Sequence, residues 1–107
     1  MATKRVARFT YLWEFHVAPS AQAQFEFEYG PRGAWATLFR KAPGYIETLL
    51  WRDHKDPLRY ATVDRWESED AHDAFRATNL LDYEEIDRRC QGYTAHQRSL
   101  GEFAEFV

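Results

Sequence analysis

The sequence predicts an α+β fold in which a four-stranded antiparallel sheet carries helices on one face. Three observations support this class. Strand-like and helix-like segments alternate in the order β-α-β-β-α-β, a short polar turn joins the two middle strands, and the helical segments are amphipathic. This order is typical of the ferredoxin-like, split β-α-β arrangement. A chain of 107 residues has the length of one such domain, so we expect residues 1–107 to form a single unit.

The first predicted strand, Arg8–Val17, alternates strictly between apolar and mostly polar positions. Its apolar set is Phe9, Tyr11, Trp13, Phe15 and Val17. A period of two residues places that whole set on one face of a sheet. The strand ends at Pro19, which has no amide to donate, and Ser20 is a suitable cap for a following helix.

Two short helices are predicted next. Phe25, Phe27 and Tyr29 alternate as in a strand, but strong helix formers precede them and Phe25 and Tyr29 form an i, i+4 pair, so we assign a helix. Glycine and proline within 30–33 break it. A second segment then has apolar residues at i, i+3, i+4 and i+7, namely Trp35, Leu38, Phe39 and Ala42. Pro43-Gly44 ends this segment.

The middle of the chain predicts a β-hairpin. Tyr45–Arg52 and Arg59–Glu67 are rich in β-forming residues, and the polar stretch Asp53–Pro57 between them is typical of a turn. Ser68 follows as a helix cap, with acidic residues at the positive end of the helix that it begins.

A further helix and a last strand complete the order. We expect Asn79 to cap a helix that Gly92 ends. Tyr93–Phe103 is assigned as the fourth strand by elimination. The tail Phe103–Val107 carries two phenylalanines, which suggests that it docks rather than frays.

Composition and charge exclude several classes of function. A net charge of −3 lacks the electrostatic footprint of a nucleic-acid-binding domain. The single Cys90 excludes an internal disulfide and a multi-cysteine zinc site, and fits a reducing compartment such as the cytoplasm. No apolar run reaches eighteen residues, and Met1–Arg8 lacks an apolar h-region, so we expect neither a membrane span nor a secretory signal.

The aromatic content is high, at 17% of the residues. So many rings are more than a small core needs, which indicates that some line a cavity or a subunit interface. A cavity lined by rings with a few polar tips suits a planar, polycyclic or phenolic ligand. The opposite sheet face mixes aliphatic and charged residues: Leu12, Glu14, His16, Ala61, Val63 and Arg65. A second copy packed there would bury the aliphatic residues and pair Glu14 with Arg65, which predicts a homodimer.

Familiar catalytic and metal-binding motifs are absent from the sequence, and the histidines show no ligand spacing. His54 and His72 are expected to be solvated. His16 and His96 lie on predicted strands, where a ligand or a partner chain can reach them. We therefore expect no metal site.

The run Thr62–Ala71 (TVDRWESEDA), followed by Phe75, resembles the antibiotic biosynthesis monooxygenase family, as does 42–50. The resemblance extends over Phe9–Leu100 and implies a dimeric α/β barrel made of two ferredoxin-like chains. The same barrel serves cofactor-free quinone-forming monooxygenases, haem-degrading enzymes, small isomerases and proteins without a known reaction, so it specifies the fold more closely than the activity.

The quinone-forming branch implies an aromatic or polyphenolic substrate, O2, and no bound cofactor. Trp66 matches the tryptophan that closes the third strand in both the quinone-forming and the haem-degrading branches. The candidate catalytic residues are Trp66, Asp64, His96 and Tyr60. The candidate substrate-binding residues are Tyr11, Trp13, Trp35, Phe39, Phe75 and Tyr83. Asp64 or His96 would be the base. A structural alternative is that Asp64 pairs with Arg65, Arg52 or Arg59.

Two other functions compete with this one. A non-catalytic carrier or sensor of an aromatic metabolite would need the same cavity but no base. A haem-degrading enzyme would need an axial histidine on the helix 80–91, which has none, and an asparagine near the position of Trp13. His72 lies too early to replace that axial ligand, so the resemblance argues against haem.

Overall fold

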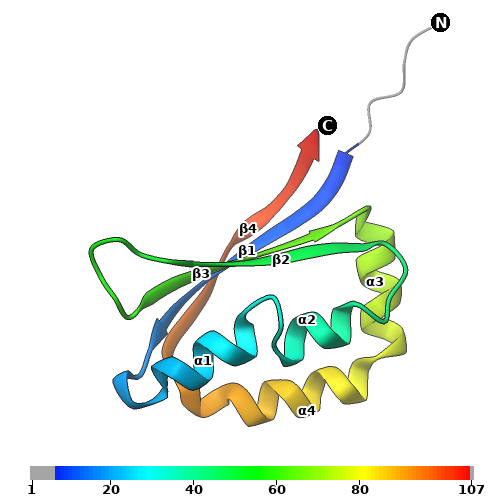
Figure 1. The fold of residues 1–107 in the computed structure, drawn as a ribbon. Helices are drawn as coiled ribbons and strands as arrows, with labels where there is room; N and C mark the ends of the chain where they lie inside the picture. The colour runs from blue at the N-terminus through cyan, green and yellow to red at the C-terminus, as the bar shows by residue number, and fades with distance from the viewer. Residues whose placement is uncertain (1–6, 107) are drawn as a thin grey trace, which may run out of the picture.

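The computed structural model describes residues 7–106, and its four strands form one antiparallel sheet in the order β2-β3-β1-β4. The strands are β1 (Ala7–Val17), β2 (Tyr45–Arg52), β3 (Arg59–Trp66) and β4 (Thr94–Phe106). The helices are α1 (Gln22–Tyr29), α2 (Ala34–Phe39), α3 (Glu69–Thr78) and α4 (Leu80–Cys90), with 3₁₀ turns η1 (Pro19–Ala21) and η2 (Gln91–Tyr93). All four α-helices lie on one side of the sheet (Figure 1). The predicted ferredoxin-like α+β fold is therefore confirmed.

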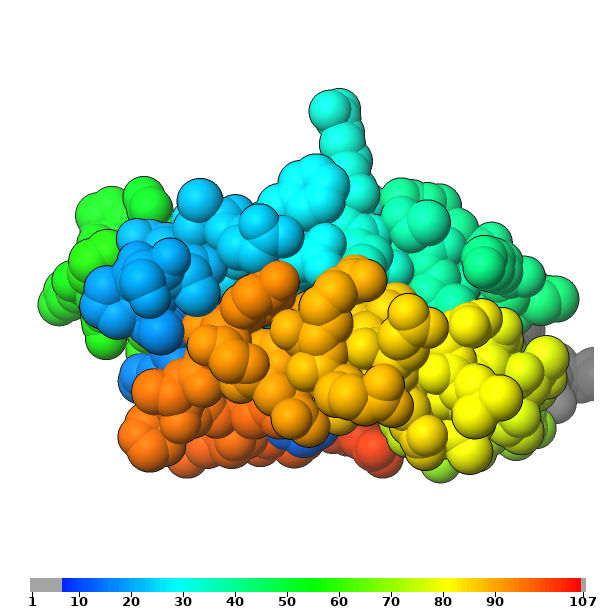
Figure 2. All heavy atoms as spheres, turned by 90° about the horizontal axis from the view of Figure 1, so that it is seen from below, coloured from blue at the N-terminus to red at the C-terminus, as the bar shows by residue number. Residues whose placement is uncertain are grey.

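The helical layer is continuous over that side of the sheet. Seen from below, α4 runs beside α1 and α2, and the end of the layer is completed by α3 (Figure 2). On the sheet side, the alternation of β1 is as predicted, since Phe9, Phe15 and Val17 are buried in the core. The space between the two layers is thus enclosed by helices below and by the odd-numbered residues of β1 above.

The strand register aligns side chains from three strands in rows that face the helices. Tyr11 of β1 is opposite Asp64 of β3, which is opposite Thr48 of β2. In the next row, Trp13 is opposite Thr62. Because directly opposite residues project from the same face of a sheet, each row presents its side chains to the helices together.

Several element ends differ from the prediction. The second helix ends at Phe39, before Pro43, and β3 ends at Trp66 rather than at Glu67. Asn79 occupies the N-cap position of α4 as predicted, but its side chain makes no capping hydrogen bond there and instead donates to the carbonyl of Phe75 at the end of α3. The fourth strand runs on to Phe106, because its last residues pair with the start of β1, so the tail docks over residues 103–106, and Val107 lies outside the described residues.

The turn between α2 and β2 requires glycine. Gly44 has a φ of +88°, a conformation that residues with a Cβ rarely adopt. A Cβ at this position would also lie 2.6 Å from the Cβ of Ala71. This close approach brings the start of β2 against α3, and so positions Tyr45 on the side of the sheet that faces the helices.

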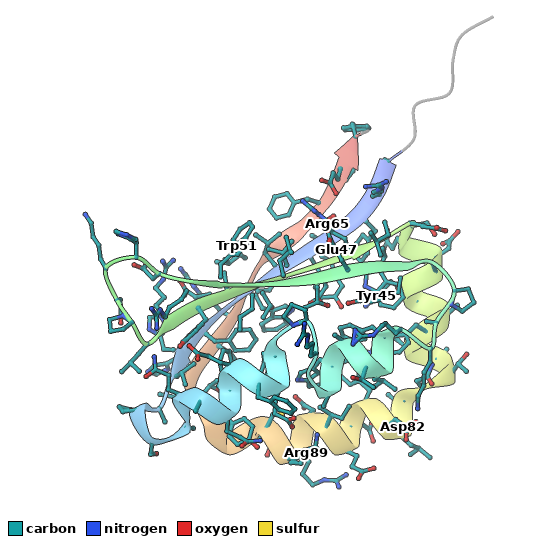
Figure 3. The ribbon with its side chains drawn as sticks, in the orientation of Figure 1. Tyr45, Glu47, Trp51, Arg65, Asp82 and Arg89 are labelled. Atoms are coloured by element: carbon teal, nitrogen blue, oxygen red, sulfur yellow. The ribbon has the colours of Figure 1, made fainter. Side chains whose placement is uncertain are left out.

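The face of the sheet opposite the helices is more polar. Trp51, Glu47 and Arg65 project from this outer face, whereas Tyr45 lies on the helical side (Figure 3). Glu14, also on the outer face, accepts hydrogen bonds from Arg59 (Nε, 2.7 Å) and Arg98 (Nε, 2.7 Å). Arg98 and then Arg59 lower the pKa of Glu14 to about 2.

The pairing of Glu14 with Arg65 is predicted between two chains, and a single chain does not test it. Within one chain, Arg65 donates to Glu47 at 2.6 Å and lies 3.4 Å from a carboxylate oxygen of Glu105. Arg65 is opposite Thr10, whereas Glu14 is opposite Ala61, so the two side chains lie apart on the same sheet. Both charges are thus already neutralised by neighbouring strands of the same sheet.

Candidate active site

A cavity of about 320 Å³ lies between the sheet and the helices. The sheet contributes Tyr11, Trp13, Phe15, Thr48, Thr62, Asp64 and Gln97 to its lining. The helices contribute Tyr29, Trp35, Phe39, Arg76, Tyr83 and Asp87. The volume falls within the range of small-molecule sites, about 300–1,000 Å³, and the lining has the usual composition of many rings and few polar groups.

The carboxyl group of Asp64 is the buried ionisable group of this lining. Asp64 is 6% exposed, and its Oδ1 accepts a hydrogen bond from Thr48 Oγ1 at 2.6 Å. Burial raises the pKa of Asp64 to about 7, while the hydrogen bond from Thr48 opposes the rise. A carboxyl group with this pKa exchanges a proton near neutral pH, which is what a general base requires.

The expected alternative, an ion pair between Asp64 and a neighbouring arginine, is absent among residues 7–106. Arg59 pairs with Glu14 and Asp53, Arg65 pairs with Glu47 and Glu105, and Arg52 lies 3.9 Å from Glu26. The three arginines are out of reach, because Arg59 and Arg65 project from the outer face while Arg52 lies two rows away, opposite Tyr60. The carboxyl group of Asp64 therefore remains without a cationic partner in the described part of the chain.

A chain of hydroxyl groups leads from Asp64 toward the edge of the sheet. The hydroxyl of Tyr45 lies 2.6 Å from Thr48 Oγ1, which in turn donates to Asp64. With Asp64 ionised, the Tyr45 hydroxyl donates to Thr48, so both bonds point toward the carboxylate. Such a chain stabilises the ionised form and holds the carboxyl group in one orientation.

Tyr11 lies beside Asp64 in the same row. Its pKa is raised well above the ordinary value, chiefly by burial and then by the nearby Asp64. The indole N–H of Trp66 opposes that rise, although it makes no hydrogen bond of good geometry with a described residue. Tyr11 therefore stays protonated at neutral pH and can act as a hydroxyl donor toward the cavity.

The structure brings most of the predicted binding residues together. Five of them line the cavity: Tyr11, Trp13, Trp35, Phe39 and Tyr83. Phe75 does not line it, because its ring packs against Phe39 and Trp66, each at a centroid distance of 5.2 Å. The Nε1 of Trp35 is buried and makes no hydrogen bond of good geometry with a described residue, although it acts on the hydroxyl of Tyr29, whose pKa it lowers against the rise caused by burial.

Of the predicted catalytic residues, Asp64 alone belongs to the lining. Trp66 is fully buried behind it, against Phe39 and Phe75. The hydroxyl of Tyr60 is engaged by Glu26 and Gln22 of α1. His96 is exposed on β4, opposite His16.

Sequence reasoning missed five polar residues of the lining: Thr48, Thr62, Arg76, Asp87 and Gln97. The alternation of β2 places Thr48 and Leu50 on one face, and this signal could have identified Thr48. Arg76 lies on the polar flank of an amphipathic helix, where the pattern alone predicts solvent. Its place in the cavity follows from how α3 meets α4.

The described residues contain neither a metal-binding cluster nor a membrane-spanning helix. No group of three or more His, Cys, Asp or Glu side chains within residues 7–106 could hold a metal ion. In the same range, no helix combines the length and hydropathy needed to cross a bilayer.

Comparison with known protein families shows to which family this chain belongs. The family model of antibiotic biosynthesis monooxygenase matches residues 8–82, from β1 into the start of α4. The chain belongs to this family. The match includes the strands that carry Tyr11, Thr48 and Asp64, so the rows of side chains that face the helices lie within the family domain. No curated protein sequence matches the chain.

Solved structures share the family fold at low identity. A candidate antibiotic biosynthesis monooxygenase from Bordetella bronchiseptica is 23% identical, with a TM-score of 0.70 over 94% of this chain and 99% of that one. SnoaB, a cofactor-independent oxygenase from Streptomyces nogalater, is 21% identical, with a TM-score of 0.65 over 90% of each chain. A conserved protein from Methanosarcina mazei is 12% identical, with a TM-score of 0.71 over 94% of each chain. At these identities the likeness establishes the fold.

Proposed function

We propose that this protein is a cofactor-independent monooxygenase that oxidises a phenolic, polycyclic aromatic substrate with O2. The observation that carries the proposal is the position of Asp64, a buried carboxyl group with a pKa of about 7 in a cavity lined by aromatic rings. Membership of the monooxygenase family supports the reaction class, and the activity described for SnoaB supports chemistry without a cofactor.

In the proposed reaction, Asp64 takes a proton from a phenol or an activated methylene of the substrate. The resulting anion transfers one electron to O2, and the two radicals combine into a peroxide. Asp64 returns its proton, and loss of water leaves a carbonyl group. The methylene carbon gives up both hydrogens and gains one oxygen atom, while the other oxygen atom leaves with those hydrogens as water. The substrate supplies all four electrons, so the balance needs no other reductant.

The protein has three tasks in this scheme. Its rings hold the substrate flat and exclude water, which strengthens electrostatic interactions within the site. Asp64 supplies the base. The Tyr11 hydroxyl is the donor available to the negative charge that develops on the substrate oxygen.

Oxygen consumption tests the proposed function. The purified protein, treated with a chelator, is mixed with an anthrone, which carries the activated methylene, and uptake is followed with an oxygen electrode. We expect protein-dependent uptake and, under ¹⁸O2, one labelled oxygen atom in the carbonyl product. Absence of protein-dependent uptake, or its loss on chelation, would contradict the proposal. Saturable binding without uptake would instead support a non-catalytic binding protein.

Replacing Thr48 with valine is expected to shift the pH dependence of the reaction. The base must be ionised to act, so activity should rise with pH through about 7, the pKa of Asp64. Thr48 lowers that pKa through its hydrogen bond. The Thr48→Val variant should therefore need a higher pH to reach half of its maximal rate. Thr37→Val, which removes a hydroxyl from α2 outside the cavity, is the matched control. An unshifted profile would show that Thr48 does not act on the base.

We also propose that two chains pair through the outer face of the sheet. The half-exposed Leu12 and the exposed Trp51 lie on that face, which has no helix over it, and a partner sheet would bury them. Light scattering should give twice the 12.7 kDa of one chain. The Leu12→Arg variant should give the mass of one chain, because a partner sheet could not cover the new charge. A single-chain mass for the unmodified protein would contradict the pairing.

A further inference from the structure

Arg76 places a fixed positive charge on the wall of the cavity. Its guanidinium carbon lies 3.9 Å from the ring centroid of Tyr83, and both residues belong to the lining. The Tyr83 ring in turn contacts the ring of the buried Trp35 at a centroid distance of 4.9 Å. This packing joins the end of α3 to α4 and restrains a side chain that would otherwise move freely in solvent.

The donors of this guanidinium are unused in the described part of the chain. Arg59 and Arg89 each donate to a carboxylate, but Arg76 has neither a hydrogen bond nor an ion pair with any residue of 7–106. Stacking on Tyr83 occupies only the flat face of the group. Its N–H donors lie in the plane, where they match the two oxygens of a planar carboxylate.

The charges of the cavity are arranged unevenly. Burial chiefly raises the pKa of Tyr11, and Arg76 counteracts that rise. The positive charge of Arg76 therefore acts on the sheet side of the cavity, where Tyr11 lies. Asp87 is also part of the lining, one helical turn after Tyr83, and adds to the rise that burial causes in the pKa of Tyr29. Arg76 thus favours an anionic group in the cavity, whereas Asp87, which opposes the effect of Arg76 on the pKa of Tyr83, disfavours one.

We propose that the ligand of this cavity is an aromatic carboxylic acid whose carboxylate binds Arg76 while its rings lie among Trp13, Trp35 and Phe39. This inference rests on the proposed function, since it names the class of substrate that the same site takes. It adds a specificity-determining residue, Arg76, to the base and the rings. A neutral aromatic compound of the same shape would leave the guanidinium without a partner on the cavity wall.

Equilibrium binding of two matched probes tests the inference without turnover. The probes are anthraquinone-2-carboxylate and its neutral carboxamide, titrated calorimetrically into the unmodified protein at low salt. We expect the acid to bind about tenfold more tightly than the amide, a typical gain for a charge-assisted hydrogen bond. Arg76→Gln should bring the two affinities within about twofold by weakening the acid alone. Arg76→Lys, which keeps the charge but lacks the planar fork, should recover only part of the preference.

The control is Arg88→Gln, which removes an exposed arginine of α4 outside the cavity lining and should leave the tenfold preference unchanged. Equal affinities of the unmodified protein for acid and amide, or no saturable binding of either, would overturn the inference. So would a preference that survives Arg76→Gln. Failure of the proposed oxygenation is distinguishable, because it would abolish oxygen uptake and leave the binding preference intact.

Discussion

The Asp64→Asn variant is expected to lose about 100-fold to 10,000-fold of the oxygen-consuming activity, the usual contribution of a general base. An asparagine has the same shape, and its carbonyl oxygen can still accept the hydrogen bond from Thr48. It cannot take a proton from the substrate. The loss should therefore appear in kcat, measured with the oxygen electrode at pH 8, where the unmodified Asp64 is mostly ionised.

The matched control is Asp82→Asn, which makes the same change on the exposed surface of α4, outside the cavity. It should keep full activity. Ligand affinity of Asp64→Asn, measured with a non-reacting anthraquinone, should stay within a few fold of the original. Activity of Asp64→Asn comparable with that of the control would remove Asp64 from the reaction and leave the cavity as a binding site.

The same substitution is expected to stabilise the folded chain at high pH. Asp64 has a pKa of about 7 when folded against an ordinary 3.8, so the folded state binds the extra proton between these values. The free energy of unfolding then falls as pH rises, and the loss is complete above about 7, the reverse of a salt-bridged aspartate. At about 1.4 kcal/mol per pH unit, the upper bound is about 4 kcal/mol.

Urea unfolding at pH 5 and pH 8.5 measures this effect. We expect Asp64→Asn to gain about 1–3 kcal/mol over the unmodified protein at pH 8.5, because part of the upper bound is lost to relaxation around the carboxylate. The gain should shrink substantially at pH 5, where Asp64 is protonated. Asp82→Asn should show no comparable gain. A destabilised Asp64→Asn at pH 8.5 would mean that the ionised carboxyl group is well accommodated in the fold.

A gain in stability together with a loss of activity is the expected signature of a group that is retained for its chemistry. A buried carboxylate without a cation costs free energy, and the fold tolerates it only where a function compensates. Either result alone has another explanation. Both in one variant identify Asp64 as a base that is held ready at a cost to the fold.

The fold was predictable because its signals are local. The strict alternation of β1 identified the strand and the face that carries Tyr11 and Trp13, and glycine marked the end of α1 and the start of α2. The residue register was not predictable, since it depends on pairing between distant strands. It is the register that places Thr48 beside Asp64 and moves Arg65 away to Glu47.

The candidate site was predictable in its aromatic part and in Asp64, but not in its other polar residues. Rings on one face of a strand such as β1, and rings on the buried stripe of a helix, come together because both project into the space between the sheet and the helices. The role of a polar residue was not predictable in this way, because it depends on which neighbouring residue forms a hydrogen bond or an ion pair with it. Tyr60 is captured by Glu26 of α1, whereas Asp64 finds no arginine within reach among the described residues. Arg76 becomes part of the cavity only because it stacks on Tyr83 of the next helix.

The most direct test of the account is an NMR titration of the Asp64 carboxyl carbon. The protein is labelled with ¹³C at aspartate carboxyl groups, and the Asp64 signal is assigned as the one missing from Asp64→Asn. We predict a midpoint at about pH 7. A midpoint near the ordinary value of 3.8 would show that the carboxyl group is ionised well below neutral pH, and would contradict its role as a buried base.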